Sequence, residues 1–197
     1  MRNSNQISKI SAPIVAGLAM LASAPLAHAG LIIDSNLSYA NTSVKSSDTD
    51  SSTQIMVVTA IGASFTNNLQ VGWSFGYLNS SMGQGASTTK SLSGTLMGPR
   101  FGLFIGKSQN WSLAATWLAL ANSTYTATGA TEEKWQGSGY CFEAGYGPEV
   151  AKNTTVGIKI LYTAVSFSSS TNTSNTTSSV SYSFGGMTPA LYLSFRF

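Results

Sequence analysis

The sequence has 197 residues and a formal net charge of +3, and only 9% of its residues are charged. Because 43% of the residues are hydrophobic, the composition excludes a chain that stays disordered for want of a core. The single cysteine excludes a framework of internal disulfides.

The first 29 residues have the pattern of an export signal. Arg2 and Lys9 provide a positive start, an uncharged and mostly apolar stretch follows, and Ala-His-Ala at 27–29 fits a small-x-small cleavage site. Cleavage there would leave 168 residues, beginning at Gly30. A retained membrane helix is the alternative, but serine and proline residues interrupt the apolar stretch.

Removal of this segment lowers the net charge to +1, because Arg2 and Lys9 are lost. The remaining lysines are scattered singly, so nucleic acid is not an expected partner. Serine and threonine then account for 28 and 21 of the 168 residues.

From Gly30 onward, the recurring pattern is an alternation of apolar and polar residues, which is typical of half-buried strands. In chain order, the alternating segments are 35–40, 55–65, 70–77, 100–105, 111–119, 140–147, 155–163 and 191–197.

The connections between these segments alternate between two lengths. Short turns are expected at 66–68, 107–110 and 151–153, and longer polar loops near 45–53, 79–90, 123–137 and 166–181. Short turns at one end and long loops at the other indicate an up-and-down meander, which is typical of transmembrane barrels. We therefore predict an all-β fold, an eight-stranded antiparallel up-and-down transmembrane β-barrel over residues 30–197, after a signal peptide at 1–29.

The last seven residues, Leu191–Phe197, alternate apolar side chains and end in an aromatic residue. In this tail and in its architecture, the mature chain resembles the small eight-stranded outer-membrane β-barrel superfamily, which includes the transmembrane domain of outer-membrane protein A and outer-membrane protein X. The resemblance implies an outer-membrane location in a Gram-negative cell. It also implies that Tyr192, Phe195 and Phe197 form the signal read by the barrel-assembly machinery. No motif identifies one member of the superfamily.

A barrel in lipid must close, because every backbone N–H and C=O needs an internal partner. We expect the apolar side of each strand to face outer-membrane lipid and the Gly, Ser and Thr side to face the interior. Aromatic rings should mark the two membrane interfaces. Those expected near the short turns are Phe65, Trp111, Tyr146, Phe195 and Phe197, and those near the long loops are Tyr77, Tyr125, Trp135, Tyr140, Tyr162 and Tyr182.

A secreted β-sandwich is the soluble alternative, and it would normally expose more charged residues than this chain has.

Six charged residues fall on the polar side of their strands: Asp34, Arg100, Glu143, Glu149, Lys159 and Arg196. Opposite charges should pair inside a narrow barrel, because an unpaired buried charge costs several kcal/mol. We expect a cluster of Arg100, Glu143 and Lys159 at mid-height, with Gly145 and Gly147 leaving room for the lysine. Asp34 and Arg196 are expected to pair where the first and last strands meet. The cluster would either plug the interior or gate a narrow ion path.

An enzymatic function finds little support in the sequence. Activation of serine usually needs a histidine, and the only histidine, His28, lies in the predicted signal peptide. Cys141 stands alone, so neither a metal nor a cofactor is expected. We predict a monomeric, non-enzymatic envelope protein that has a structural role or binds host or other surface ligands through four Ser/Thr-rich loops. A narrow passive pore for small solutes or ions is the alternative.

Overall fold

The computed structural model describes residues 30–42, 51–66, 68–84, 87–106 and 108–197. The predicted signal peptide and most of the first predicted loop, 45–53, lie outside these ranges. Among the described residues there is no helix with the length and hydropathy needed to cross a membrane.

Eight long strands and one short strand make up the described chain, and each of the eight predicted segments overlaps one of the long strands. The strands are β1 (Gly30–Thr42), β2 (Ser51–Ser64), β3 (Leu69–Gln84), β4 (Ser87–Ile105), β5 (Trp111–Ala127), β6 (Glu133–Tyr146), β7 (Glu149–Ala151), β8 (Thr154–Asn172) and β9 (Thr177–Arg196).

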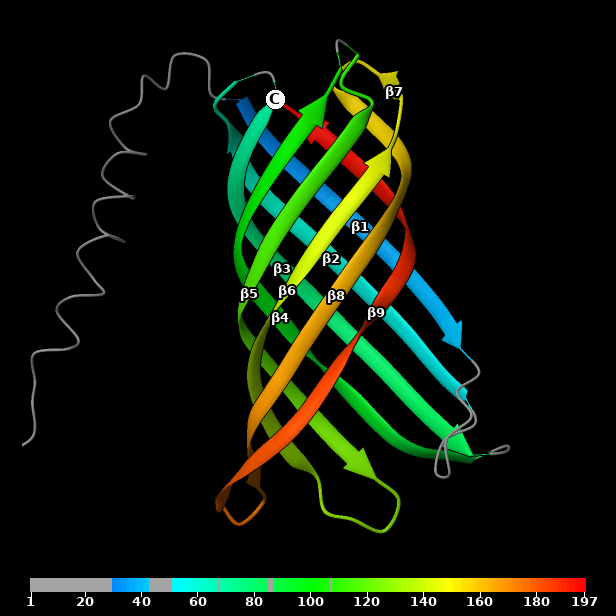
Figure 1. Cartoon of the computed structure of the whole chain (residues 1–197), viewed down its shortest axis with the longest axis vertical. Coiled ribbons are helices and arrows are strands. Elements are labelled where there is room, and N and C mark those ends of the chain that lie inside the picture. The colour runs from blue at the N-terminus through cyan, green and yellow to red at the C-terminus, as the bar shows by residue number, and fades with distance from the viewer. Residues whose placement is uncertain (1–29, 43–50, 67, 85–86, 107) are drawn as a thin grey trace, which may run out of the picture.

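The long strands form one closed ring. Each pairs antiparallel with its neighbours in the order β6-β5-β4-β3-β2-β1-β9-β8, and the pairing of β6 with β8 completes the circle (Figure 1). The short β7 pairs with β8. The predicted fold, an eight-stranded antiparallel up-and-down barrel, is confirmed, and the two stacked sheets of a β-sandwich are excluded.

The two ends of the barrel differ in how the strands connect. Gly30 and Phe197 lie at one end, here called the terminal end, together with the turns that join β2 to β3, β4 to β5 and β7 to β8. Turns were predicted at these three places. The opposite end, here called the far end, carries the connections at 128–132 and 173–176.

The strands are longer than predicted, and they take up most of three predicted loops. β3 and β4 cover most of 79–90, β5 and β6 most of 123–137, and β8 and β9 most of 166–181. Hydroxyl pairs join the strands there, such as Ser166 with Ser183 at 3.3 Å. A strand with water on its outer face needs no apolar residue there, so its polar sequence looks like a loop.

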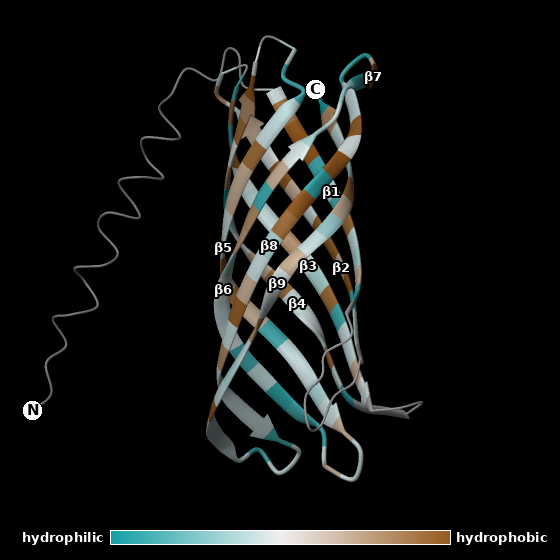
Figure 2. Ribbon diagram, turned by 45° about the vertical axis from the view of Figure 1, so that its right-hand side comes forward, coloured by the Kyte–Doolittle hydropathy of each residue, from teal (hydrophilic) through white to brown (hydrophobic). Residues whose placement is uncertain are grey.

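The predicted sidedness is confirmed in the terminal half of the barrel. Most apolar residues of the strands there point outward, and Ile158 and Leu191 are 65% and 64% exposed. Ile32, Phe104 and Tyr192 are the larger exceptions and are buried inside. Figure 2 shows the hydrophobic colour mainly in the half of the wall toward the C-terminus.

In the far half the sidedness reverses, contrary to the prediction of one apolar outer face along the whole barrel. The pairing of β6, β8 and β9 arranges outward residues in cross-strand rows. One apolar row consists of Phe142, Tyr162 and Met187. The row four residues farther toward the far end on each strand is polar, and it consists of Ser138, Ser166 and Ser183. The apolar side chains of these strands turn inward beyond that boundary.

Candidate functional site

Four charged side chains from four strands meet inside the terminal half of the barrel, and we call them the charge layer. They are Asp34 on β1, Arg100 on β4, Glu143 on β6 and Lys159 on β8. Both terminal nitrogens of Arg100 donate to Glu143, with Nη2 at 3.0 Å from Oε2. Nη2 of Arg100 also lies 3.3 Å from Oδ2 of Asp34, and Lys159 Nζ lies 3.1 Å from Oε2 of Glu143. Two positive and two negative charges make the layer neutral.

Uncharged side chains complete the network around the charge layer. Asn36 Nδ2 donates to Glu143 Oε2 at 3.1 Å, and Gln70 Nε2 donates to Asp34 Oδ2 at 3.2 Å. The ammonium of Lys159 lies 4.3 Å from the centre of the Tyr192 ring. None of these three neutral partners was predicted for the cluster, because their positions depend on the register between strands that are distant in sequence.

The predicted cluster of Arg100, Glu143 and Lys159 therefore forms, because alternation along each strand places these side chains on the inward face. Gly145 lies opposite Lys159, and a Cβ there would come within 2.2 Å of the lysine Cγ, so the glycine makes room for the lysine. Gly147 does not serve this purpose, because its neighbour is the Tyr192 ring.

The predicted pairing of Asp34 with Arg196 is wrong. The register between β1 and β9 places Arg196 opposite Ile32, two residues closer to the terminal end than Asp34. Arg196 instead stacks over the Phe104 ring at 4.0 Å and donates to Gln109 Oε1. Asp34 joins the charge layer through Arg100.

Glu149 also lies outside the charge layer. It sits in β7 at the terminal end, where it is exposed and accepts a hydrogen bond from the backbone N–H of Asn153 at 2.7 Å.

The three residues of the predicted assembly signal divide between the two faces of β9. Tyr192 is buried in the interior, whereas Phe197 is 70% exposed just after the strand, with its ring 6.5 Å from that of Phe195. Their role in assembly remains a prediction.

A second layer of the interior, here called the apolar layer, lies next to the charge layer on the side of the far end. On β8, for example, Lys159 is followed on the same face by Leu161 and Val165, which are 0% and 1% exposed. The whole layer consists of Met56, Val58, Leu78, Leu92, Leu96, Leu118, Ala121, Trp135, Cys141, Leu161, Val165, Phe167 and Ala190. The prediction of an interior built from Gly, Ser, Thr and charges is therefore wrong for the far half.

Three aromatic residues predicted for the outer interface belong to this interior instead. Trp135 stacks on Tyr125 with ring centres 4.2 Å apart, and its ring centre lies 5.1 Å from that of Tyr182. The other three aromatic residues predicted for this interface, Tyr77, Tyr140 and Tyr162, do point outward, and they lie near the boundary between the two halves. The prediction for Trp135, Tyr125 and Tyr182 rested on the nearness of these residues to the long loops. Trp135 and Tyr182 share the inward face of their strands with Glu143 and Tyr192. Tyr125 turns inward after the register shift between Leu118 and Ala121.

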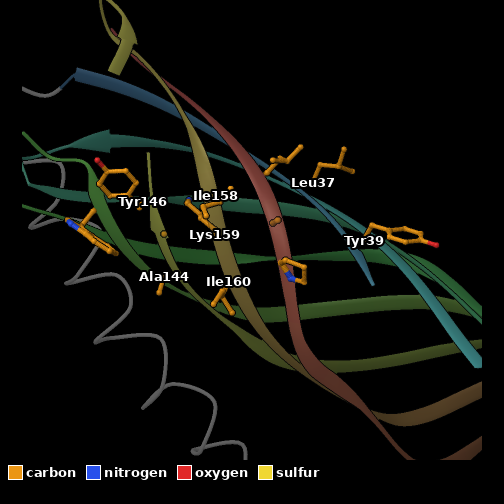
Figure 3. A pocket seen from close by; sticks show the side chains of 12 residues that line it. Leu37, Tyr39, Ala144, Tyr146, Ile158, Lys159 and Ile160 are labelled. Carbon is orange, nitrogen blue, oxygen red and sulfur yellow. The ribbon is translucent and has the colours of Figure 1, made fainter. Parts of the chain in front are cut away.

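The outer wall of the terminal half carries an apolar furrow with a volume of about 630 Å³. One side follows a row of cross-strand neighbours: Trp111, Tyr146, Ile158, Leu191 and Leu37. The facing row consists of Ala144, Ile160 and Pro189, and Figure 3 shows the first two. Lys159 contributes only to the floor, since its ammonium points inward to Glu143.

Within the described ranges, no three His, Cys, Asp or Glu side chains are grouped so that they could hold a metal ion.

No protein-family model matches the sequence, and no curated protein matches it. Among solved structures, the chain is similar to Neisserial surface protein A at 15% identity, with a TM-score of 0.47 over 86% of this chain and 97% of that one. It is also similar to outer membrane protein AlkL, whose structure was determined in DMPC bilayers, at 10% identity, with a TM-score of 0.45 over 85% of this chain and 90% of that one. The assignment of the fold rests on the strand pairing of the chain itself.

Proposed function

We propose that this protein is an integral, non-enzymatic protein of the bacterial outer membrane, and that the terminal half of its barrel crosses the lipid. The observation that carries the proposal is the continuous apolar outer wall of that half, which includes Ile158, Ile160 and Leu191 at 58–65% exposure. A monomer in water rarely exposes an apolar surface of this extent. The furrow beside Ile158 has the lining that acyl chains require.

The far half, in this proposal, stands outside the lipid on the cell surface. Its outward residues are hydroxyl-rich and its apolar residues are buried inside, which is the arrangement of a barrel surrounded by water. With the terminal end toward the periplasm, the far half would extend the barrel wall outward as a rigid support for surface interactions. This support would take the place of most of three of the four Ser/Thr-rich loops that the sequence suggested.

Labelling of introduced cysteines tests this placement. In a Cys141→Ser background, a membrane-impermeant maleimide added to intact cells should modify Ser138→Cys, which lies on the exposed far wall. It should not modify Ile158→Cys, which is equally outward but lies in the apolar wall. The protein should also fractionate with membranes and show heat-modifiable gel mobility. Recovery of the folded protein in a detergent-free soluble fraction would overturn the proposal.

A narrow passive pore is the second candidate function, and the charge layer in the interior is the observation that favours it. The burial of the interior argues against conduction. Arg100 and Glu143 are each 3% exposed, and Leu78, Leu92 and Leu161 in the next layer are 0% exposed. An ion path needs water along its whole length, and the burial of these side chains supports the proposal that neither layer conducts.

We therefore expect no steady single-channel current when the purified protein is reconstituted in planar bilayers. Arg100→Ala should open the charge layer but leave the apolar layer closed, so this variant should be silent as well. A stable current in the native protein that changes in Arg100→Ala would favour the pore.

A further inference from the structure

The wall of the barrel is not closed equally along its height. β1 and β9 pair only from Ile32 with Arg196 to Ser38 with Ala190, whereas β9 pairs with β8 over nearly its whole length. Beyond Ser38 the two strands diverge toward the far end (Figure 1). Among the described residues, the segment Thr177–Pro189 of β9 therefore has a ladder along one edge only.

Pro189 explains where the ladder to β1 stops. The backbone N–H of Phe197 donates to Leu31 on the β1 side, and that of Arg196 donates to Asn153 on the β8 side. Since backbone N–H groups alternate between the two edges of a strand, the nitrogen of Pro189 falls on the β1 side. Pro189 is the next residue of β9 toward the far end beyond the last pair, Ala190 with Ser38. Because proline has no N–H to donate, the ladder to β1 stops there.

The same alternation identifies the backbone groups on the free edge. The register between β8 and β9 is regular from Tyr182 to Phe195, so the N–H and C=O groups of Ser183, Gly185 and Met187 point away from β8. No charged residue and no proline occurs in Thr177–Thr188. Charged residues, prolines and β-bulges commonly prevent pairing at an exposed sheet edge. In this segment, the one feature of this kind is a register shift near Val180.

The side chains beside this edge define what could pair with it. Ser183 points outward and is exposed. Tyr182 and Phe184 point inward and are only partly buried against the apolar layer. Met187 belongs to the last apolar row of the outer wall, so the edge begins at the membrane boundary and continues into the far half.

We propose that the free edge of β9, from Tyr182 to Thr188, binds an extended segment of another polypeptide by β-strand addition. Donors and acceptors repeat along the edge about every 6.8 Å, and a polypeptide strand matches this repeat whereas an acyl chain offers no hydrogen-bonding groups. Side chains of the added strand that point inward should be apolar, because they would lie beside Tyr182 and Phe184. Those that point outward should be uncharged and polar, as Ser183 is. This inference deepens the proposed function, and it rests on the far half lying outside the lipid.

A matched pair of peptides tests the hydrogen-bonding requirement on the full-length mature protein in detergent micelles. The first is a capped decapeptide that alternates valine with threonine and ends in lysine for solubility. The second has the same side chains but carries N-methyl groups at every second residue, so that one edge cannot donate. We expect the first peptide to bind at least tenfold more tightly. It should also slow hydrogen exchange at the Ser183, Gly185 and Met187 amides by at least tenfold.

Two substitutions test the edge from the side of the protein. Ser183→Pro and Met187→Pro remove an N–H from the free edge and leave the ladder to β8 intact, so each should weaken peptide binding at least tenfold. Ser183→Ala keeps the backbone N–H and should bind as the native protein does. Unchanged heat-modifiable mobility would show that the variants are folded.

Two results would overturn the inference: equal binding of the two peptides, or strong protection of the Ser183 and Gly185 amides before any peptide is added. The peptide pair gives an answer even where a proline variant fails to fold. Membrane fractionation and cysteine labelling are independent of these measurements, so failure of the edge to bind is distinguishable from failure of the proposed location.

Discussion

Replacing Glu143 with alanine should lower the free energy of unfolding of the barrel by about 3–5 kcal/mol, the range for breaking a buried ion pair on one side. Glu143 accepts hydrogen bonds from Arg100, Lys159 and Asn36, and its side chain is 1% exposed. Without it, two buried cations would face each other with Asp34 as the one remaining anion of the charge layer. Urea unfolding of the protein in lipid vesicles, followed by tryptophan fluorescence, measures the effect.

Two controls separate the loss of charge balance from the loss of a side chain. Glu149→Gln removes an exposed carboxylate at the terminal end and should change the free energy of unfolding by less than about 0.5 kcal/mol. Glu143→Gln combined with Lys159→Met restores neutrality and should recover at least half of the loss. If Glu143→Ala unfolds within about 1 kcal/mol of the native protein, the charge layer is not a stabilising plug.

Replacing Ile158 with arginine should destabilise the protein in vesicles by about 2–4 kcal/mol, the cost of arginine near the midplane on the lipid face of a barrel. Ile158 is 65% exposed on the outer wall of the terminal half, so the substitution creates no clash inside the barrel. The loss of stability would therefore show whether lipid or water surrounds the side chain at this position. The same urea titration measures it.

Ser166→Arg is the matched control, because Ser166 lies on the same strand and the same outer face as Ile158 and is also exposed. In the far half, arginine would meet water, and we expect a change of at most about 1 kcal/mol. Equal costs at the two positions would contradict the division of the barrel into a lipid-crossing half and an external half.

The reversal of sidedness along the barrel has a simple physical reason. In the terminal half, an apolar outer wall suits lipid, and polar or charged residues can be satisfied by one another inside, as Arg100 and Glu143 are. In the far half, water surrounds the wall in the proposed setting, so stability has to come from an apolar interior such as Leu161 and Phe167. One strand can pass through both settings because its apolar residues lie on the outer face in the terminal half and on the inner face in the far half.

Some features of the candidate site followed from single strands. Alternation placed Arg100, Glu143 and Lys159 on the inward face of three strands, and neutralisation of buried charge then required them to meet. The partner of Asp34 did not follow, because the choice between Arg100 and Arg196 depends on a two-residue difference in the register of β1 against β9. Asn36 and Gln70 were missed for the same reason.

The amino-acid sequence by itself determined the number of long strands, their antiparallel up-and-down order and the apolar outer wall of the terminal half. These follow from period-two alternation and from short turns that alternate with longer polar connections, both of which are local properties. Only the tertiary structure decided how far the strands extend, which residues line the far interior and where β9 separates from β1. Those features depend on cross-strand register and on register shifts such as that between Leu118 and Ala121, which arise from contacts between strands and leave no pattern within one strand.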